Sequence, residues 1–226
     1  MFSTVAWDWN GTLLDDLDAA VGAVNALLEA RGLAALDNAR YKEIFTFPVI
    51  DFYRRAGFAF EIESFEDVAA RFVESYMKQS RTCRLFDDAP RALERLREAG
   101  LSQVLLTASY EQMLLAQLSA FDIKDCFDEL IAQKDALARG KTDSARLYMR
   151  DKGIDPREMV LIGDSEHDCD VADELGAACI LVPRGHHGRD RLEARMKRSG
   201  SQGVVLDNLT DAAEWIVDGL SARRGL

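Results

Sequence analysis

The stretch Val5–Thr12, which reads VAWDWNGT, decides the fold of this chain. The stretch Phe2–Trp7, which precedes Asp8, is short, apolar and β-favouring. The residues after Asp8 are expected to form a turn around Gly11. An apolar strand without polar alternation is typical of a sheet that is covered on both faces. We therefore expect a buried strand that ends at Asp8.

A regular alternation of helices and strands follows from about Cys83 onward. The expected strands cover 102–106, 129–132, 159–162, 178–182 and 204–206, and the expected helices cover 88–99, 111–118, 142–150, 168–175 and 210–220. Such alternation predicts an α/β fold, with a Rossmann-like parallel sheet as its core.

The segment between about Asp16 and Cys83 contains helical patterns but no strand pattern. Apolar residues recur at helical spacing over 14–28, and Ser64–Asp67 resembles a capping box that opens a second long helix. We interpret this segment as an inserted helical cap. The expected organisation is a core domain of residues 1–15 and 84–226 and a cap domain of residues 16–83.

The composition restricts the possible partners of the chain. It has 226 residues, 48% hydrophobic and 30% charged, with a formal net charge of −11, which disfavours binding to nucleic acid. The longest run without a charged residue, Ala99–Tyr110, is too short to span a membrane. The four cysteines include no C-x-x-C pair, and no export signal is visible, so we expect a cytoplasmic protein with reduced thiols. The basic stretch Arg184–Arg198 is expected to form a solvated helix face.

Two apolar strands each end in an aspartate, at Asp8 and at Asp164. In open α/β sheets the ligand site lies at the carboxyl ends of the strands. If the two strands are neighbours, the two carboxylates converge, which is unfavourable unless a cation or a proton lies between them. Hard oxygen ligands of this kind suit Mg²⁺.

Four short motifs resemble those of the haloacid dehalogenase superfamily of phosphohydrolases, in the order in which that family has them. They are DWNGTL at 8–13, LLT at 105–107, Lys141, and GDSEHD at 163–168. The helical insertion has the length and character of that family's smaller cap. The resemblance spans essentially the whole chain, and the cap stretch Phe45–Arg55 looks like that of phosphoglycolate phosphatase-like members.

The resemblance implies a role for each matching position. Asp8 would be the nucleophile that forms an aspartyl-phosphate, and Thr107 and Lys141 would hold the transferring oxygens. The metal ligands would be Asp8, Asp164 and the backbone carbonyl of Asn10.

Further residues would support these groups or bind the substrate. Ser165 and Asp168 would lie behind the metal ligands, orienting Lys141 or a metal-bound water. Gly11, Thr12 and Ala108 would bind the substrate. Arg54 would meet a substrate carboxylate, and two adjacent loop histidines, His186 and His187, are expected to be solvated.

Asn10 departs from the family pattern, because the phosphatases usually have a second aspartate there as general acid and base. The chain is then a phosphatase whose substrate needs little protonation, an engineered trap, or an impaired member that binds phosphometabolites. Phosphonoacetaldehyde hydrolases also lack this aspartate, and a cap lysine (Lys42 or Lys78) would be needed for their Schiff base. Sugar phosphomutases and metal-free dehalogenases fit the motifs less well. If Asn10 limits turnover, its replacement by aspartate is predicted to raise the rate.

The expected function is that of a Mg²⁺-dependent phosphatase acting on a small phosphorylated metabolite, a phosphoglycolate-like phosphomonoester. We expect no nucleic-acid or membrane partner, and a monomer or weak homodimer.

Overall fold

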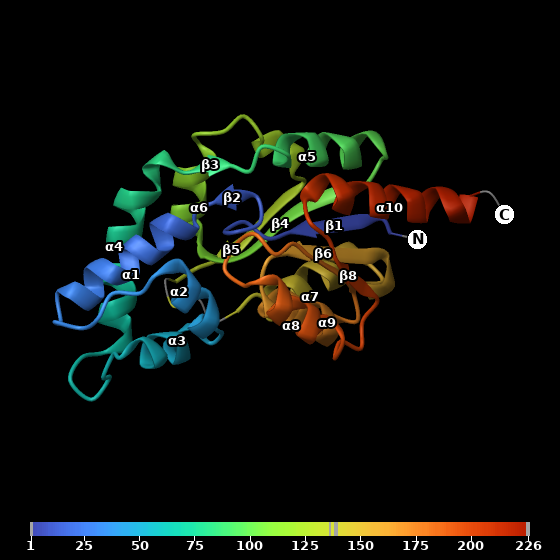
Figure 1. Cartoon of the computed structure of the whole chain (residues 1–226). Coiled ribbons are helices and arrows are strands. Elements are labelled where there is room, and N and C mark those ends of the chain that lie inside the picture. Colours follow the sequence, from blue (N-terminus) through green and yellow to red (C-terminus); the bar gives the residue numbers. More distant parts are fainter. Residues whose placement is uncertain (1, 136, 138–139, 225–226) are drawn as a thin grey trace.

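The computed structural model describes residues 2–135, 137 and 140–224. Its centre is a six-stranded sheet in the order β5-β4-β1-β6-β7-β8, and every strand pairing in it is parallel (Figure 1). The strands are β1 (Thr4–Trp7), β4 (Ser102–Tyr110), β5 (Glu129–Gln133), β6 (Met159–Gly163), β7 (Ala178–Leu181) and β8 (Gly203–Val205). This sheet confirms the α/β class predicted from the alternating pattern.

Strand β1 lies in the middle of the sheet, at the point where the chain order reverses. Trp7, its last residue, pairs with Leu105 of β4 on one side and with Ile162 of β6 on the other. β1 and β6 therefore end close to one another, and β4 continues past them to Tyr110. Ligand sites of open α/β sheets lie at such a reversal, beyond the carboxyl ends of the strands.

Helices cover both faces of the sheet (Figure 1). Alternate side chains of β1 point to opposite faces, so that Val5 and Trp7 belong to one hydrophobic cluster and Ala6 to another. The first cluster includes residues of α5 (Ala89–Glu98), α6 (Glu111–Leu118) and α10 (Leu209–Arg224). The second includes residues of α7 (Thr142–Lys152), α8 (Glu166–Leu175) and α9 (Arg189–Met196).

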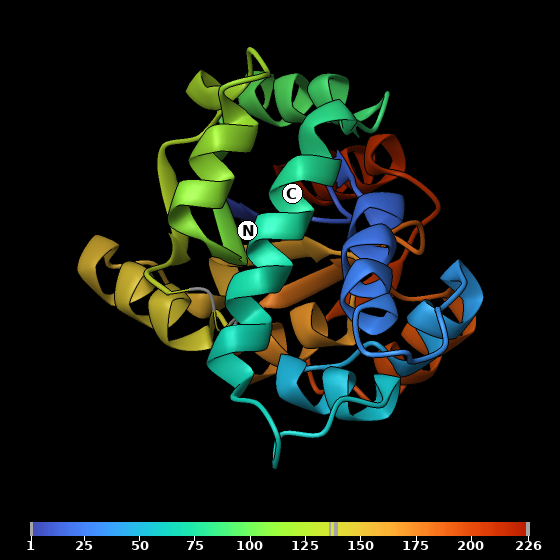
Figure 2. The same cartoon turned by 90° about the vertical axis from the view of Figure 1, so that its left-hand side faces the viewer.

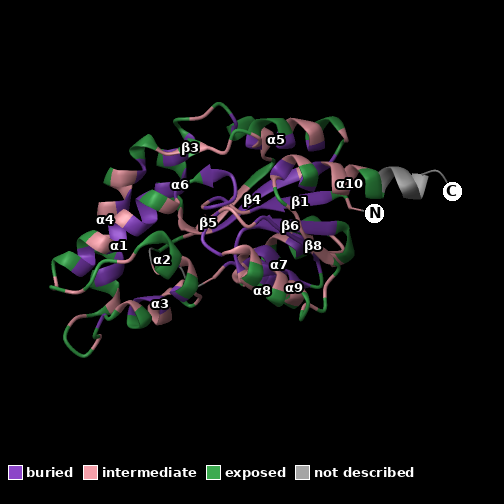
Figure 3. Cartoon of the chain, viewed as in Figure 1, coloured by how far each residue is buried: buried purple, intermediate pink, exposed green. Residues whose placement is uncertain are grey.

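The segment that follows β1 forms a separate group of helices beyond the carboxyl ends of the strands (Figure 2). It contains α1 (Leu17–Glu29), α2 (Asn38–Ile44), α3 (Val49–Ala56) and α4 (Phe65–Gln79). These helices bury their apolar faces against one another in a third cluster, rich in aromatic rings, and keep their outer faces exposed (Figure 3). Ser64 accepts a hydrogen bond from the Asp67 backbone at 3.1 Å, which confirms the predicted cap of α4.

Two very short strands, which the sequence pattern does not predict, join this helical group to the rest of the chain. β2 (Leu14–Asp15) pairs antiparallel with β3 (Arg84–Leu85), so the two connecting segments lie side by side. Strands of two residues are too short to show a periodic pattern. Single turns of 3-10 helix cover Ser80–Thr82, Lys124–Cys126 and Pro156–Glu158.

Two local details differ from what the sequence indicates. An aspartate directly before a helix is usually its cap, but the side chain of Asp88 accepts hydrogen bonds from Arg184 and from the Leu209 backbone, both at 2.8 Å, and does not cap α5. Strand β4 continues to Tyr110 rather than ending at 106, with a break in the register of its pairing with β5. None of the helices in the described part of the chain is long and apolar enough to cross a lipid bilayer.

Candidate active site

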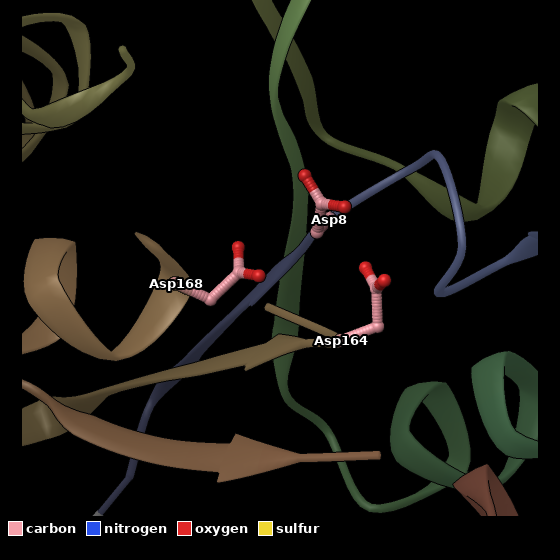
Figure 4. Close-up of side chains that lie close together, drawn as sticks. All are labelled: Asp8, Asp164 and Asp168. Carbon is pink, nitrogen blue, oxygen red and sulfur yellow. The ribbon is translucent and has the colours of Figure 1, made fainter. Parts of the chain in front are cut away.

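Three carboxylates meet at the carboxyl ends of the central strands (Figure 4). Asp8 follows β1, Asp164 follows β6, and Asp168 lies in the first turn of α8. One oxygen of each lies within 4.8 Å of the other two. The sequence predicted that Asp8 and Asp164 converge, and the pairing of β1 with β6 is the reason that they do.

Lys141 is the cation of this cluster, and it is almost fully buried. Its Nζ lies 2.6 Å from Asp8 Oδ1 and 2.6 Å from Asp168 Oδ1, and it donates to the Leu106 carbonyl at 3.0 Å. Burial alone would lower the pKa of Lys141, but Asp168 and Asp8 raise it above its ordinary value. The lysine is therefore charged and holds both carboxylates.

One lysine does not neutralise three carboxylates. Burial, opposed by Lys141 but reinforced by Asp168 and Asp164, raises the pKa of Asp8 to about 8. Burial likewise raises the pKa of Asp164 to about 6. Carboxylates held this close in a buried site stay ionised only with more positive charge nearby, so the donor set fits a divalent cation with oxygen ligands.

Asp164 is fixed in place by two donors. Thr12 Oγ1 donates to its Oδ1 at 3.0 Å, and the His186 backbone donates to its Oδ2. A Cβ at Gly185 would lie 2.1 Å from that Oδ2, and one at Gly11 would lie 2.4 Å from it. The two glycines are therefore required for the loops to approach the carboxylate.

Asp168 is oriented by its own helix. Its Oδ2 accepts from the Ser165 hydroxyl at 2.7 Å and from the Ser165 backbone at 3.0 Å, which completes a capping box at the start of α8. Its other oxygen binds Lys141. Asp168 therefore links Ser165 to Lys141.

The end of β4 contributes a second wall. Thr107 is buried, and its Oγ1 accepts a hydrogen bond from the Ser109 backbone at 3.1 Å. The hydroxyl hydrogen of Thr107 is not used in this bond. Thr107 and Ala108 both line the pocket.

Asn10 is held by side chains outside the cluster of three carboxylates. Its Nδ2 donates to Asp16 Oδ2 at 2.8 Å and to the Tyr76 hydroxyl at 2.7 Å, and its Oδ1 accepts from Ser109 Oγ. The carboxylate of Asp16 therefore lies within hydrogen-bond distance of Asn10, the position at which the family's phosphatases usually have an aspartate.

Asp16 is a pocket residue that sequence reasoning missed. Its Oδ1 accepts from the Gly11 backbone at 2.8 Å and lies 3.6 Å from His186 Nε2. Burial would raise the pKa of Asp16, but the hydrogen bond and charge of His186, with Tyr76 and Asn10, lower it. An aspartate directly before a helix is usually a cap, so its position gave no functional signal.

The expectation that His186 and His187 are solvated was wrong, because the loop after β7 folds under the helical group. Both side chains are buried. His186 lines the pocket, with its Nδ1 3.1 Å from the Tyr41 hydroxyl. Burial would lower the pKa of His186, but Asp16, with Asp164 and Asp8, raises it to about 9.

His187 joins the two parts of the chain. Its Nδ1 accepts from the Glu166 backbone at 2.9 Å, and its Nε2 donates to the Phe45 carbonyl at 3.0 Å. Only the neutral ring can make both bonds. Burial, reinforced by Arg191, lowers the pKa of His187 to about 3.

The lowered pKa predicts a contribution to acid sensitivity. Between the unfolded value of 6.5 and the folded value of about 3, only the unfolded chain binds the proton, so stability falls as the pH falls. We expect this group to lower the unfolding free energy by about 1.4 kcal/mol per pH unit below 6.5, and His187→Gln to remove that part of the slope. Urea denaturation of both proteins between pH 7.5 and 5 measures it. Equal slopes in the two proteins would contradict the assignment.

The carboxylates open into one pocket of about 990 Å³, part of it open to solvent. The sheet side contributes the polar groups already described, together with Tyr110, Met113 and His167. The helical side contributes only Ala, Val, Phe and Tyr side chains, namely Ala20, Val24, Tyr41, Phe45, Phe47, Val49, Phe52, Tyr53, Phe65, Ala69, Phe72, Val73 and Tyr76. Phe47 closes over the site by stacking on His167, with ring centroids 4.1 Å apart.

Several predicted residues are not part of this pocket wall. Arg54 is 57% exposed and pairs with Asp51 at 2.8 Å, because α3 turns Phe52 and Tyr53 inward instead. The Gly11 backbone N–H donates to Asp16, and the Thr12 hydroxyl donates to Asp164. In the described part of the chain, neither Gly11 nor Thr12 lines the pocket.

The basic stretch after β7 pairs with acidic side chains of the same chain. Arg184 binds Asp88, Arg191 binds Glu166, and Arg195 binds Asp170 and Asp173. The side chains of Arg184, Arg191 and Arg195 are 14–24% exposed, so they are held in ion pairs rather than solvated as expected.

The sequence model of the haloacid dehalogenase-like hydrolases matches residues 5–182. The chain is 26% identical to phosphoglycolate phosphatase 1 of Pseudomonas aeruginosa, over 92% of this chain and 77% of that protein. It is 25% identical to phosphoglycolate phosphatase of Synechococcus elongatus, over 84% of this chain and 88% of that protein.

Solved structures share the fold. A haloacid dehalogenase-like family hydrolase from Streptococcus pneumoniae superposes with a TM-score of 0.80 at 16% identity, covering 95% of this chain and 98% of its own. A predicted phosphatase from Clostridium acetobutylicum gives 0.78 at 18% identity, covering 96% and 99%. With the match to the family covering most of its length, and with the strand-end aspartates in place, the chain belongs to the haloacid dehalogenase-like hydrolases.

Proposed function

We propose that this hydrolase is a Mg²⁺-dependent phosphatase that acts on a small phosphomonoester through an aspartyl-phosphate at Asp8. The observation that carries the proposal is the convergence of Asp8, Asp164, Asp168 and Lys141 at the bottom of a closed-over pocket. The phosphatase names of the relatives at 25–26% identity support the same reaction class.

Asp8 would act as the nucleophile. Its Oδ1 is held by Lys141 at 2.6 Å, so the side chain has a fixed direction at the end of β1. Attack by its carboxylate on phosphorus breaks the ester P–O bond and expels the alkoxide, which takes a proton from water to give the alcohol. Attack of water on the phosphorus of the aspartyl-phosphate then breaks the bond between phosphorus and Asp8, releases orthophosphate and a proton to solvent, and regenerates the Asp8 carboxylate.

The other residues would position the phosphoryl group and its charge. Asp8, Asp164 and the Asn10 backbone carbonyl would hold the Mg²⁺ ion, which when bound would neutralise charge on the phosphoryl oxygens. The Thr107 hydroxyl would donate to one of those oxygens, and Lys141 would supply positive charge beside them. Asp168 would keep Lys141 in place through its 2.6 Å ion pair.

We also propose that residues 16–83 form a cap domain over a core of 1–15 and 84–226. The separate hydrophobic cluster of α1 to α4 and the paired connections β2 and β3 support this division. The cap would exclude water from the reacting phosphoryl group.

Two alternatives have less support. A Schiff-base phosphonatase would need a cap lysine in the pocket, but neither Lys42 nor Lys78 lines it, and Lys78 pairs with Glu74 on the surface. An impaired binding protein would show no turnover. Release of phosphate from a generic aryl phosphate, with and without Mg²⁺, separates that alternative from the phosphatase.

Removal of Asp164 is predicted to remove the metal dependence. We expect Asp164→Ala to lower turnover by at least about 10²-fold and to abolish Mg²⁺ binding measured by calorimetry, because a carboxylate that holds the ion is lost. Asp170→Ala, on the exposed side of α8, is the matched control. Unchanged Mg²⁺ affinity in Asp164→Ala would refute the ligand assignment.

A further inference from the structure

The helical wall of the pocket has no charge. Every side chain that residues 20–76 place against the pocket is Ala, Val, Phe or Tyr, and this whole segment lies within the described part of the chain. The arginines and lysines of the segment do not line the pocket. Arg31 pairs with Glu63, and Arg54 pairs with Asp51.

The hydroxyls of Tyr76 and Tyr41, two tyrosines of this wall, are turned toward groups of the core. The Tyr76 hydroxyl donates to Asp16 and accepts from Asn10 and from Gln117. The Tyr41 hydroxyl lies 3.1 Å from His186 Nδ1. These hydroxyls therefore have partners in the protein and leave ring faces toward the pocket.

The cations on the sheet side of the pocket already have anionic partners. Lys141 lies 2.6 Å from both Asp8 and Asp168, and His186 lies 3.6 Å from Asp16. The described pocket residues include four aspartates beside Lys141 and His186.

A second anionic group on the substrate would therefore contact the apolar helical wall, which contains no cation to pair with it. Burial of an unpaired carboxylate is strongly unfavourable. An apolar group in the same place gains about fourfold in affinity for each buried methylene.

We propose that the alcohol released by this enzyme is uncharged and mainly apolar, an alkyl or arylalkyl alcohol, and that the helical wall rejects phosphomonoesters that carry a carboxylate. This inference rests on the proposed phosphatase function and specifies its substrate class. The proposed substrate class therefore differs from phosphoglycolate, the substrate in the names of the relatives.

Two esters with similar leaving oxygens test the proposal: 3-phenylpropyl phosphate and 3-carboxypropyl phosphate. Both release a primary alcohol, so the chemical step is matched and the distal group differs. We expect kcat/KM to be at least about 100-fold higher for the phenyl ester. The carboxypropyl ester would lose the hydration of its carboxylate in the pocket, whereas the phenylpropyl ester would bury apolar surface. Equal values, or a preference for the carboxylate, would overturn the proposal.

A cation added to the wall should change that ratio. Val73 lines the pocket from α4, whereas Ala70 is exposed on the same helix. We expect Val73→Lys to lower the preference by at least tenfold and Ala70→Lys to leave it unchanged. An unchanged ratio in folded Val73→Lys would count against the wall as the source of selectivity.

Binding without turnover separates this inference from the proposed function. Calorimetry with 4-phenylbutylphosphonate and 4-carboxybutylphosphonate, which have a methylene in place of the ester oxygen, measures the same selectivity in the wild-type protein. If neither ester is hydrolysed, the phosphatase proposal fails, and tighter binding of the phenyl phosphonate still supports the inference. Tighter binding of the carboxylate refutes it whatever the activity.

Discussion

Asp8→Asn is expected to lower kcat by roughly 10⁴- to 10⁶-fold, the range for loss of a catalytic nucleophile. The amide cannot attack phosphorus and cannot carry the phosphoryl group. The fold should persist, because Lys141 keeps Asp168 as an ion-pair partner at 2.6 Å and keeps the Leu106 carbonyl at 3.0 Å.

The measurement is phosphate release from an aryl phosphate, with the thermal midpoint and circular dichroism as checks on folding. Asp143→Asn is the matched control, since the Asp143 side chain is 99% exposed. A folded Asp8→Asn protein that retains a tenth of the wild-type rate would show that Asp8 is not the nucleophile.

Asn10→Asp is expected to lower turnover by tenfold or more, although the family pattern alone predicts a gain. The Asn10 amide donates to Asp16 at 2.8 Å, so an aspartate at this position would set two carboxylates against each other in a mostly buried site. Loss of the hydrogen bond to a charged group, with the added repulsion, should cost at least about 2 kcal/mol of stability.

The exchanged pair, Asn10→Asp with Asp16→Asn, separates charge from position. It again places one carboxylate and one amide side by side, so we expect it to recover most of the stability lost in Asn10→Asp and to turn over faster than that single variant. Urea denaturation and steady-state rates of the wild type, the two single variants and the exchanged pair form a double-mutant cycle. A single Asn10→Asp variant that is faster than wild type would show that contact with Asp16 does not govern residue 10.

The sequence predicts most of the core because its elements have strong local signals. The helix over Glu111–Leu118 agrees at both ends with α6, and the aspartates after β1 and β6 lie where the strand ends predict. In these cases the apolar pattern, the end of the strand and the chemistry of the side chain all belong to neighbouring residues.

The remaining site residues depend on packing between distant segments. Asp16 begins a helix and His186 belongs to a loop, and their proximity at 3.6 Å arises only when the loop after β7 packs under α1 and α2. Arg54 shows the opposite case, because a residue type suited to a carboxylate lies on the outer face of α3 and pairs with Asp51. Neither outcome follows from residue type or spacing.

The central claim is that the phosphoryl group is transferred to Asp8. Protein mixed with an excess of aryl phosphate and Mg²⁺ can be quenched in acid within the first turnovers and treated with borohydride, which reduces an acyl phosphate to an alcohol. The account predicts that mass spectrometry finds homoserine at position 8 in the wild type, in proportion to the early release of the aryl alcohol, and none in Asp8→Asn. Turnover with unmodified Asp8, or with the label on another residue, would contradict it.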